Sequence, residues 1–138
     1  MIDHAFSLQV RVYYEDTDAA GVVYYANYLR FLERCRTDWL ASLGHPVVEL
    51  ERRHGIVFVV RRIEVDYRVP ARLSDTLDVT VAIETLGRAS LTVQQRVLRS
   101  SQTLLNARVM LACVDRERLR PVRIPFALND SEHPESRR

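Results

Sequence analysis

Residues 25–43, YANYLRFLERCRTDWLASL, contain the most regular helical pattern of the chain. Five bulky side chains recur there at spacings of three and four, namely Tyr28, Leu32, Cys35, Trp39 and Leu43. Charged residues occupy the other sides, so the pattern predicts one amphipathic helix of about five turns. Gly44 and then Pro46 predict its end, because glycine favours the position after a helix and proline cannot continue one.

Five other segments alternate apolar with polar residues: 6–14, 63–69, 77–84, 89–97 and 105–113. A period of two is typical of strands. The turns between the last strands are short and polar, which favours antiparallel pairing because a parallel crossover needs a dozen or more residues. The sheet has an apolar face to cover, and only the helix carries a substantial apolar stripe. We therefore predict an α+β fold, a five-stranded antiparallel sheet wrapped around one long central helix.

The length of 138 residues and the hydrophobic fraction of 47% predict a single globular domain over residues 1–128. The polar ending NDSEHPESRR predicts a frayed tail over residues 129–138. The apolar stretches are shorter than the roughly 20 residues that a membrane-spanning helix needs, and the first residues do not resemble a signal peptide. We expect a cytoplasmic protein that does not insert into membranes.

The net charge is +2, and all 20 basic residues are arginine. No basic run is interleaved with aromatic residues as in a nucleic-acid groove, so no nucleic-acid partner is expected. The planar guanidinium nevertheless suits phosphates, which keeps a phosphorylated small ligand among the candidates. Cys35 and Cys113 lie in apolar segments, and we expect them to be buried rather than paired or bound to metal.

Residues 15–28, EDTDAAGVVYYANY, place two carboxylates, Asp16 and Asp18, before a glycine and an apolar run. The spacing Asp-x-Asp-x-x-Gly resembles the start of a calcium loop. Ala20 and Asn27, however, stand where that loop needs a ligand oxygen and a bidentate glutamate. We therefore predict no metal site and no cofactor.

Two other interpretations of this stretch remain open from the residues alone. Aspartate is a good helix N-cap and Gly21 eases a tight turn, so the acids fit a capped turn before the helix. A carboxylate followed by Gly-Val-Val-Tyr-Tyr also fits a catalytic group at the mouth of an apolar pocket. We expect Asp16 to organise the loop.

The segment VRVYYEDTDAAGVVYYANYLRFLERCRTDWL resembles the 4-hydroxybenzoyl-CoA thioesterase family, in its branch of small bacterial acyl-CoA thioesterases encoded beside the Tol-Pal cell-envelope system. The likeness continues through FVVRRIEVDYRVPARLSDTLDV, TLLNARVMLACVD and RPVRIP, so it runs from Val10 to Pro125. Its most specific part is Asp-x-x-Gly-Val-Val-Tyr. The resemblance implies a hotdog fold, hydrolysis of acyl-CoA, and homodimers that often pair into tetramers.

The resemblance also implies the site residues. It makes Asp18 the catalytic carboxylate and gives the backbone N–H of Tyr25, near the helix start, to the oxyanion. It places Val59, Val60 and Arg61 along the acyl thioester. Arg88 lies near a basic position that relatives use toward the CoA portion.

Asp18 has two possible roles, as a nucleophile that forms a mixed anhydride or as a general base for water, and the resemblance favours the first. A hydratase or dehydratase of the same fold is an alternative, but no histidine follows Asp18 in the loop. A non-catalytic acyl-carrier or envelope-associated binding protein is another. The thioester carrier stays open between CoA and acyl-carrier protein.

Overall fold

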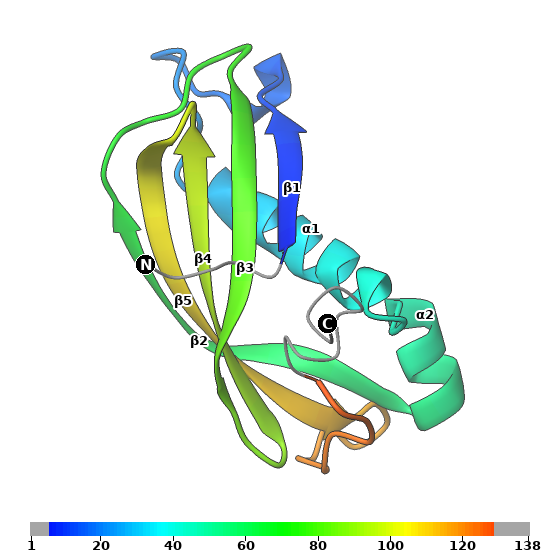
Figure 1. Ribbon diagram of the computed structural model, residues 1–138. Coiled ribbons are helices and arrows are strands. Elements are labelled where there is room, and N and C mark those ends of the chain that lie inside the picture. Colours follow the sequence, from blue (N-terminus) through cyan, green and yellow to red (C-terminus); the bar gives the residue numbers. More distant parts are fainter. Residues whose placement is uncertain (1–5, 129–138) are drawn as a thin grey trace.

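The computed structural model describes residues 6–128 and contains one five-stranded antiparallel sheet in the order β1-β3-β4-β5-β2 (Figure 1). The strands are β1 (Phe6–Arg11), β2 (Ile56–Tyr67), β3 (Thr76–Leu86), β4 (Ser90–Arg99) and β5 (Gln102–Asp115). The helices are α1 (Asn27–Ser42) and α2 (Val47–Glu49), with a 3-10 turn at Tyr14–Asp16 and a π turn at Leu50–His54. The sheet curves around α1 (Figure 1), which confirms the predicted α+β hotdog architecture.

The long helix α1 buries the predicted stripe. Tyr28, Leu32, Cys35 and Trp39 are buried in the core, and Leu43 is half-buried just after the last helical residue. The helix ends where Gly44 takes a φ of 91°, a left-handed conformation that glycine adopts without steric cost. The Gly44 N–H donates to the Ala41 carbonyl and the next N–H donates to the Leu40 carbonyl, the pairing of a Schellman motif.

The inner face of the sheet is apolar and packs on α1. Its fully buried side chains come mainly from the three central strands: Leu77, Val79 and Val81 of β3, Leu91, Val93 and Val97 of β4, and Leu105, Val109 and Cys113 of β5. Gln95 interrupts this face and is only 1% exposed. Its Nε2 donates to the Leu32 carbonyl at 3.1 Å and to the Thr80 carbonyl at 3.3 Å, which ties α1 to β3.

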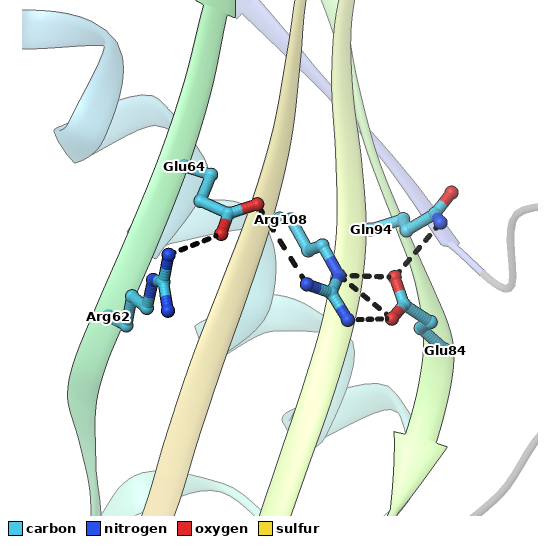
Figure 2. Close-up of polar contacts among 5 residues, drawn as sticks. All are labelled: Arg62, Glu64, Glu84, Gln94 and Arg108. Atoms are coloured by element: carbon cyan, nitrogen blue, oxygen red, sulfur yellow. Dashed lines mark hydrogen bonds and ion pairs between the residues drawn. The ribbon is translucent and has the colours of Figure 1, made fainter.

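The sheet face turned away from α1 carries a network of charged and polar side chains from four strands (Figure 2). The Arg108 guanidinium donates to Glu84 at 2.6 to 2.9 Å and lies 3.8 Å from Glu64. Arg62 pairs with Glu64, and Gln94 donates to Glu84. These side chains are accessible to water, so we expect each pair to stabilise the fold by only ~0–1 kcal/mol.

The first strand is shorter than the predicted segment 6–14. It ends at Arg11 because the Asp16 carboxylate accepts the Tyr13 N–H and closes a 3-10 turn. Tyr14 is therefore 82% exposed instead of continuing the inner face. The predicted tail 129–138 lies outside the described residues. Over residues 6–128, none of the helices combines the length and the apolar character needed to cross a membrane.

Candidate active site

Asp18 is the first residue of a tight turn, and its backbone and side chain form the hydrogen bonds that close this turn. Its N–H donates to the Val22 carbonyl at 2.9 Å, and its carbonyl accepts the Gly21 N–H at 3.0 Å. Gly21 has a φ of 79°, which requires a residue tolerant of the left-handed region. Oδ1 of Asp18 accepts the Ala20 N–H at 2.8 Å, whereas Oδ2 has no protein donor among residues 6–128. The carboxylate is exposed and has one oxygen free for chemistry.

The turn is fixed to the β2–β3 connection. Thr17 bridges Val23, and Val22 bridges Arg72. The Val23 N–H donates to the Ala71 carbonyl at 2.8 Å, and both of these side chains are buried. The Asp18 loop is therefore held in place by its two flanks, which fixes the position of the carboxylate.

Asp16 has a structural role that differs from that of Asp18. Its side chain is buried, 8% exposed, and Oδ2 accepts the Tyr13 N–H at 2.9 Å. Its carbonyl accepts the Tyr24 N–H at 3.0 Å and the Asn27 Nδ2 at 2.9 Å. Asp16 thus binds Tyr13 before the Asp18 loop and Tyr24 and Asn27 after it. These bonds confirm the predicted role of Asp16 as a loop organiser.

Tyr25 precedes α1 and is 61% exposed. Its carbonyl accepts the Tyr67 hydroxyl at 3.0 Å, but no residue of the described chain accepts its N–H. The helix N-cap, Ala26, provides no side-chain cap, and the first turn contains no acidic residue. The start of α1, the positive end of its dipole, therefore follows an amide without an acceptor among residues 6–128, a combination that favours a developing negative charge nearby.

Aromatic rings surround the Tyr25 segment. The Tyr25 ring lies 4.7 Å from that of Tyr24 and 6.3 Å from that of Tyr67, between centroids. Tyr67 also contacts Tyr28, whose hydroxyl accepts the Ala71 N–H at 2.9 Å. Burial raises the pKa of Tyr28 and of Tyr67, so both hydroxyls stay protonated at neutral pH. The contact between Tyr67 and Tyr25 was missed from the sequence, because 42 positions separate the two residues.

The residues that the resemblance assigns to the acyl thioester lie toward the other end of β2. Val59 is half-buried, and Val60 is 47% exposed. Arg61 lies at a register shift, between the pairs that Val60 and Arg62 form with β5. Val60 and Tyr67 are seven positions apart in β2, a span of about 23 Å along a strand. Within one chain, residues 59–61 therefore lie far from Tyr25.

The turn between β3 and β4 contains Arg88, whose carbonyl accepts the Ile124 N–H at 2.8 Å. The Asp18 loop lies near the opposite end of β3, because Val12 exchanges hydrogen bonds with Ser74 and Asp75 there. Strand β3 has 11 residues, or about 36 Å. Within one chain, Arg88 and Asp18 are therefore at opposite ends of the sheet.

The two cysteines do not compete with Asp18 as nucleophiles. Cys35 and Cys113 are free and buried, as predicted, and burial raises the pKa of the Cys35 thiol to about 12. A thiol with that pKa contains almost no thiolate at neutral pH. Residues 6–128 contain no group of three or more His, Cys, Asp or Glu side chains that could hold a metal ion.

The chain is similar to proteins of known family. The model of the thioesterase-like superfamily matches residues 12–131. The acyl-CoA thioesterase YbgC of Haemophilus influenzae is 41% identical over 133 residues, covering 96% of this chain and 98% of that protein. The acyl-CoA thioester hydrolase YbgC of Escherichia coli is 43% identical over 124 residues, covering 89% and 92%. The crystal structure of a probable thioesterase from Bartonella henselae has a TM-score of 0.82 at 35% identity, covering 86% and 98%.

These similarities extend over the fold and over the loop that carries Asp18. The matched region includes α1 and all strands from β2 to β5. The sheet wrapped around α1 is the hotdog arrangement that the residues and the resemblance predict. The chain belongs to the thioesterase-like superfamily, in the branch of its YbgC relatives.

Proposed function

We propose that this protein hydrolyses acyl-CoA thioesters to a free acid and CoA, with Asp18 as the catalytic carboxylate. The names of its relatives support the reaction class. The observation that carries the assignment is the Asp18 carboxylate on a fixed loop, with one oxygen free, together with the unused Tyr25 amide before α1. A thioester carbonyl needs both a nucleophile or base and a donor for its developing oxyanion.

In the favoured mechanism, the free Asp18 oxygen attacks the thioester carbonyl carbon. The carbonyl oxygen becomes an oxyanion and is stabilised by the Tyr25 N–H and the positive end of α1. The carbon–sulfur bond then breaks, CoA leaves as the thiolate, and a mixed anhydride with Asp18 remains. Water hydrolyses the anhydride to the free acid and restores the carboxylate. In the alternative, Asp18 removes a proton from the water that attacks directly.

Substitution of Asp18 tests the assignment. Asp18→Asn keeps the shape but removes the charge, so we expect kcat to fall by about 10³-fold or more if the carboxylate is the nucleophile or base. Binding of a non-hydrolysable acyl-CoA analogue should persist. Glu15→Gln is the matched control, since it removes an exposed carboxylate from the same loop. Unchanged turnover in Asp18→Asn would exclude this role and favour a non-catalytic binding protein or another reaction of acyl thioesters.

Isotope labelling separates the two mechanisms. Hydrolysis over many turnovers in heavy-oxygen water labels the Asp18 carboxylate only if an anhydride forms and water attacks its aspartyl carbonyl carbon, so that the acyl group leaves as the free acid. Mass analysis of the peptide containing Asp18 detects the label. A single turnover places the label in the acid when water attacks directly, so labelled Asp18 with an unlabelled first product identifies the covalent route.

We also propose that the working form is a homodimer or a dimer of dimers. The family resemblance implies that Val60 and Arg88 bind substrate. Within one chain, however, much of the sheet lies between these residues and Asp18. A second copy supplies these residues if two chains join along β2, a 12-residue edge strand with exposed Val60 and Tyr67. Light scattering should give twice or four times the chain mass of 16.0 kDa. A monomeric enzyme with full activity would exclude this arrangement.

The proposal also includes the carrier of the acyl group and the cellular location of the enzyme. We expect acyl-CoA to be the main substrate, with acyl-carrier protein as the alternative carrier, and parallel assays of thiol release with both carriers decide between them. Free, buried cysteines fit a reducing compartment, which supports a cytoplasmic location. Cell fractionation tests that location.

A further inference from the structure

The Asp18 loop rests on residues 70–75, which lie between β2 and β3. The Val23 N–H donates to the Ala71 carbonyl at 2.8 Å, and the Leu73 N–H donates to the Gly21 carbonyl at 3.4 Å. We call residues 70–75 the loop support. Because these backbone bonds hold the loop, the shape of the loop support decides where the carboxylate of that loop lies.

Asp75 closes the loop support. Its Oδ2 accepts the Arg72 N–H at 2.8 Å, and its own N–H donates to the Arg72 carbonyl at 3.1 Å. Between these two residues, Ser74 has a φ of 72°, a left-handed conformation that is unfavourable for residues other than glycine. The turn therefore does not form by local preference alone and depends on a carboxylate that stays in place.

Arg99, the last residue of β4, joins the two ends of the loop support. Its Nη1 donates to Asp75 Oδ2 at 2.7 Å and to the Pro70 carbonyl at 3.4 Å, and its Nη2 donates to Gln102 Oε1 at 3.2 Å. Both side chains of the ion pair are half-buried, 26% exposed for Arg99 and 22% for Asp75. Water and salt screen such a pair less than a fully exposed one, so it holds the segment more firmly.

The charge of Asp75 persists at neutral pH. Burial acts to raise the pKa of this carboxyl, but the Arg72 N–H and the Arg99 guanidinium outweigh burial, and the pKa is lowered. Of the ion pairs within residues 6–128, only that of Arg99 with Asp75 includes a residue of the loop support. The loop support therefore depends on this one ion pair.

We propose that Arg99 is a positioning residue of the active site, which holds Asp75 and Pro70 so that the loop support keeps the Asp18 carboxylate at the thioester. The three hydrogen bonds of the Arg99 side chain go to Pro70, Asp75 and Gln102, so Arg99 acts on the loop through its support. This inference rests on the proposed role of Asp18 as the catalytic carboxylate. Misplacement of a catalytic group by about 1 Å can lower a rate by about 100-fold.

Arg99→Gln tests the proposal, since it removes the charge and the fork but keeps a polar side chain. We expect kcat to fall about 5- to 50-fold. KM should change less than about twofold, because the loop support contains none of the residues that the resemblance assigns to the substrate. Arg108→Gln is the matched control, since it breaks a comparable ion pair with Glu84 on the outer face of the same sheet and should leave kcat unchanged. Wild-type kcat in folded Arg99→Gln, or an equal loss in Arg108→Gln, would overturn the proposal.

A double-mutant cycle shows whether Arg99 acts through Asp75. Asp75→Asn should lower kcat about as much as Arg99→Gln, and the double variant should lie within about twofold of the lower single variant, because both changes remove the same contact. Losses that multiply would overturn the assigned route. Arg99→Lys keeps the ion pair and should recover kcat to within about threefold of the wild type. If Arg99→Gln fails to fold, the comparison of Asp75→Asn with Arg99→Lys provides the kinetic test.

Amide hydrogen exchange measures how firmly the loop is held without any assay of activity. The Val23 N–H, which donates to the Ala71 carbonyl, should exchange about 5- to 50-fold faster in Arg99→Gln than in Arg108→Gln. Equal exchange of Val23 in the two variants would overturn the positioning role. Full turnover in Asp18→Asn would instead refute the proposed function, so the two failures are distinguishable.

Discussion

The hydroxyl of Tyr67 lies 3.0 Å from the Tyr25 carbonyl oxygen and donates a hydrogen bond to it. The two rings also meet edge to face, 6.3 Å apart. Tyr67 is the last residue of β2, and Tyr25 lies just before α1. The contact therefore fixes the Tyr25–Ala26 peptide against the edge of the sheet, directly after the peptide unit whose N–H is the proposed oxyanion donor.

Tyr67→Phe tests that contact. The change removes one hydroxyl and should loosen the Tyr25 backbone, so the neighbouring N–H is held less firmly. We expect kcat to fall about 2- to 10-fold, the value of one hydrogen bond. KM should change less, because the bond positions the donor and does not hold the acyl group. Tyr14→Phe is the control, since it removes the hydroxyl of an exposed tyrosine. Equal kcat in the wild type and in Tyr67→Phe would contradict this positioning role.

Substitution of Asp16 should affect stability, and substitution of Asp18 should affect activity. Asp16→Ala leaves the Tyr13 N–H without its acceptor and should lower the free energy of unfolding by ~1–3 kcal/mol. Asp18→Ala removes an exposed side chain and should change that free energy by less than ~0.5 kcal/mol while abolishing hydrolysis. Urea titrations and thiol-release assays on both variants measure the two quantities. A large loss of stability in Asp18→Ala would assign a structural role to that carboxylate.

Local patterns predict much of this fold. The stripe from Tyr28 to Trp39 predicts α1 because a helix places every third or fourth side chain on one face. The strand order and the contact of Tyr67 with Tyr25 come from packing between segments far apart in the sequence, which a local period does not contain. A local period does not predict the early end of β1 either, because that end depends on the hydrogen bond from Tyr13 to Asp16. For the site, the residues suggest a carboxylate at a turn, and the family resemblance adds its substrate.

Gln95 was missed by the alternating pattern, because a polar residue occupies an inward position between Val93 and Val97. Gln95→Leu should lower the free energy of unfolding by ~1–3 kcal/mol, since Arg36 then loses its acceptor in a half-buried place. Gln94→Leu, one residue earlier on the outer face, should cost less than ~0.5 kcal/mol. Thermal and urea unfolding of the two variants provide the comparison. Equal losses would show that the inward amide contributes no more than a surface one.

The β4–β5 turn offers a stabilising change. Ser100 and Ser101 have φ values of 48° and 72°, a left-handed conformation that costs a non-glycine residue about 1–2 kcal/mol. Ser101→Gly removes this strain but makes the unfolded chain more flexible, so a net gain of ~0.5–1 kcal/mol is expected. Gln102→Gly, in the following strand residue, should instead lower stability. A decrease in the melting temperature of Ser101→Gly would contradict the strain assigned to the turn.

His45 should make the stability of the fold depend on pH. Its ring stacks on Phe126 with centroids 3.8 Å apart, and the His54 ring is tilted against the same Phe126 with centroids 5.6 Å apart. Burial, and then the charge of His54, lowers the pKa of His45 below its ordinary value of 6.5. The unfolded chain therefore binds a proton at a higher pH than the folded one. Stability is complete above pH 6.5 and falls as the pH decreases from there toward the lowered pKa.

His45→Phe keeps an aromatic ring on Phe126 and removes the titrating group. We expect its free energy of unfolding to change less than that of the wild type between pH 7 and pH 5.5, with the two curves closest at the higher pH. The carboxylates of Asp75 and Glu84 have lowered pKa values, so their losses occur at more acidic pH and do not enter this window. Urea titrations at four pH values measure both slopes. Parallel slopes would show that protonation of His45 does not contribute to the acid sensitivity of this protein.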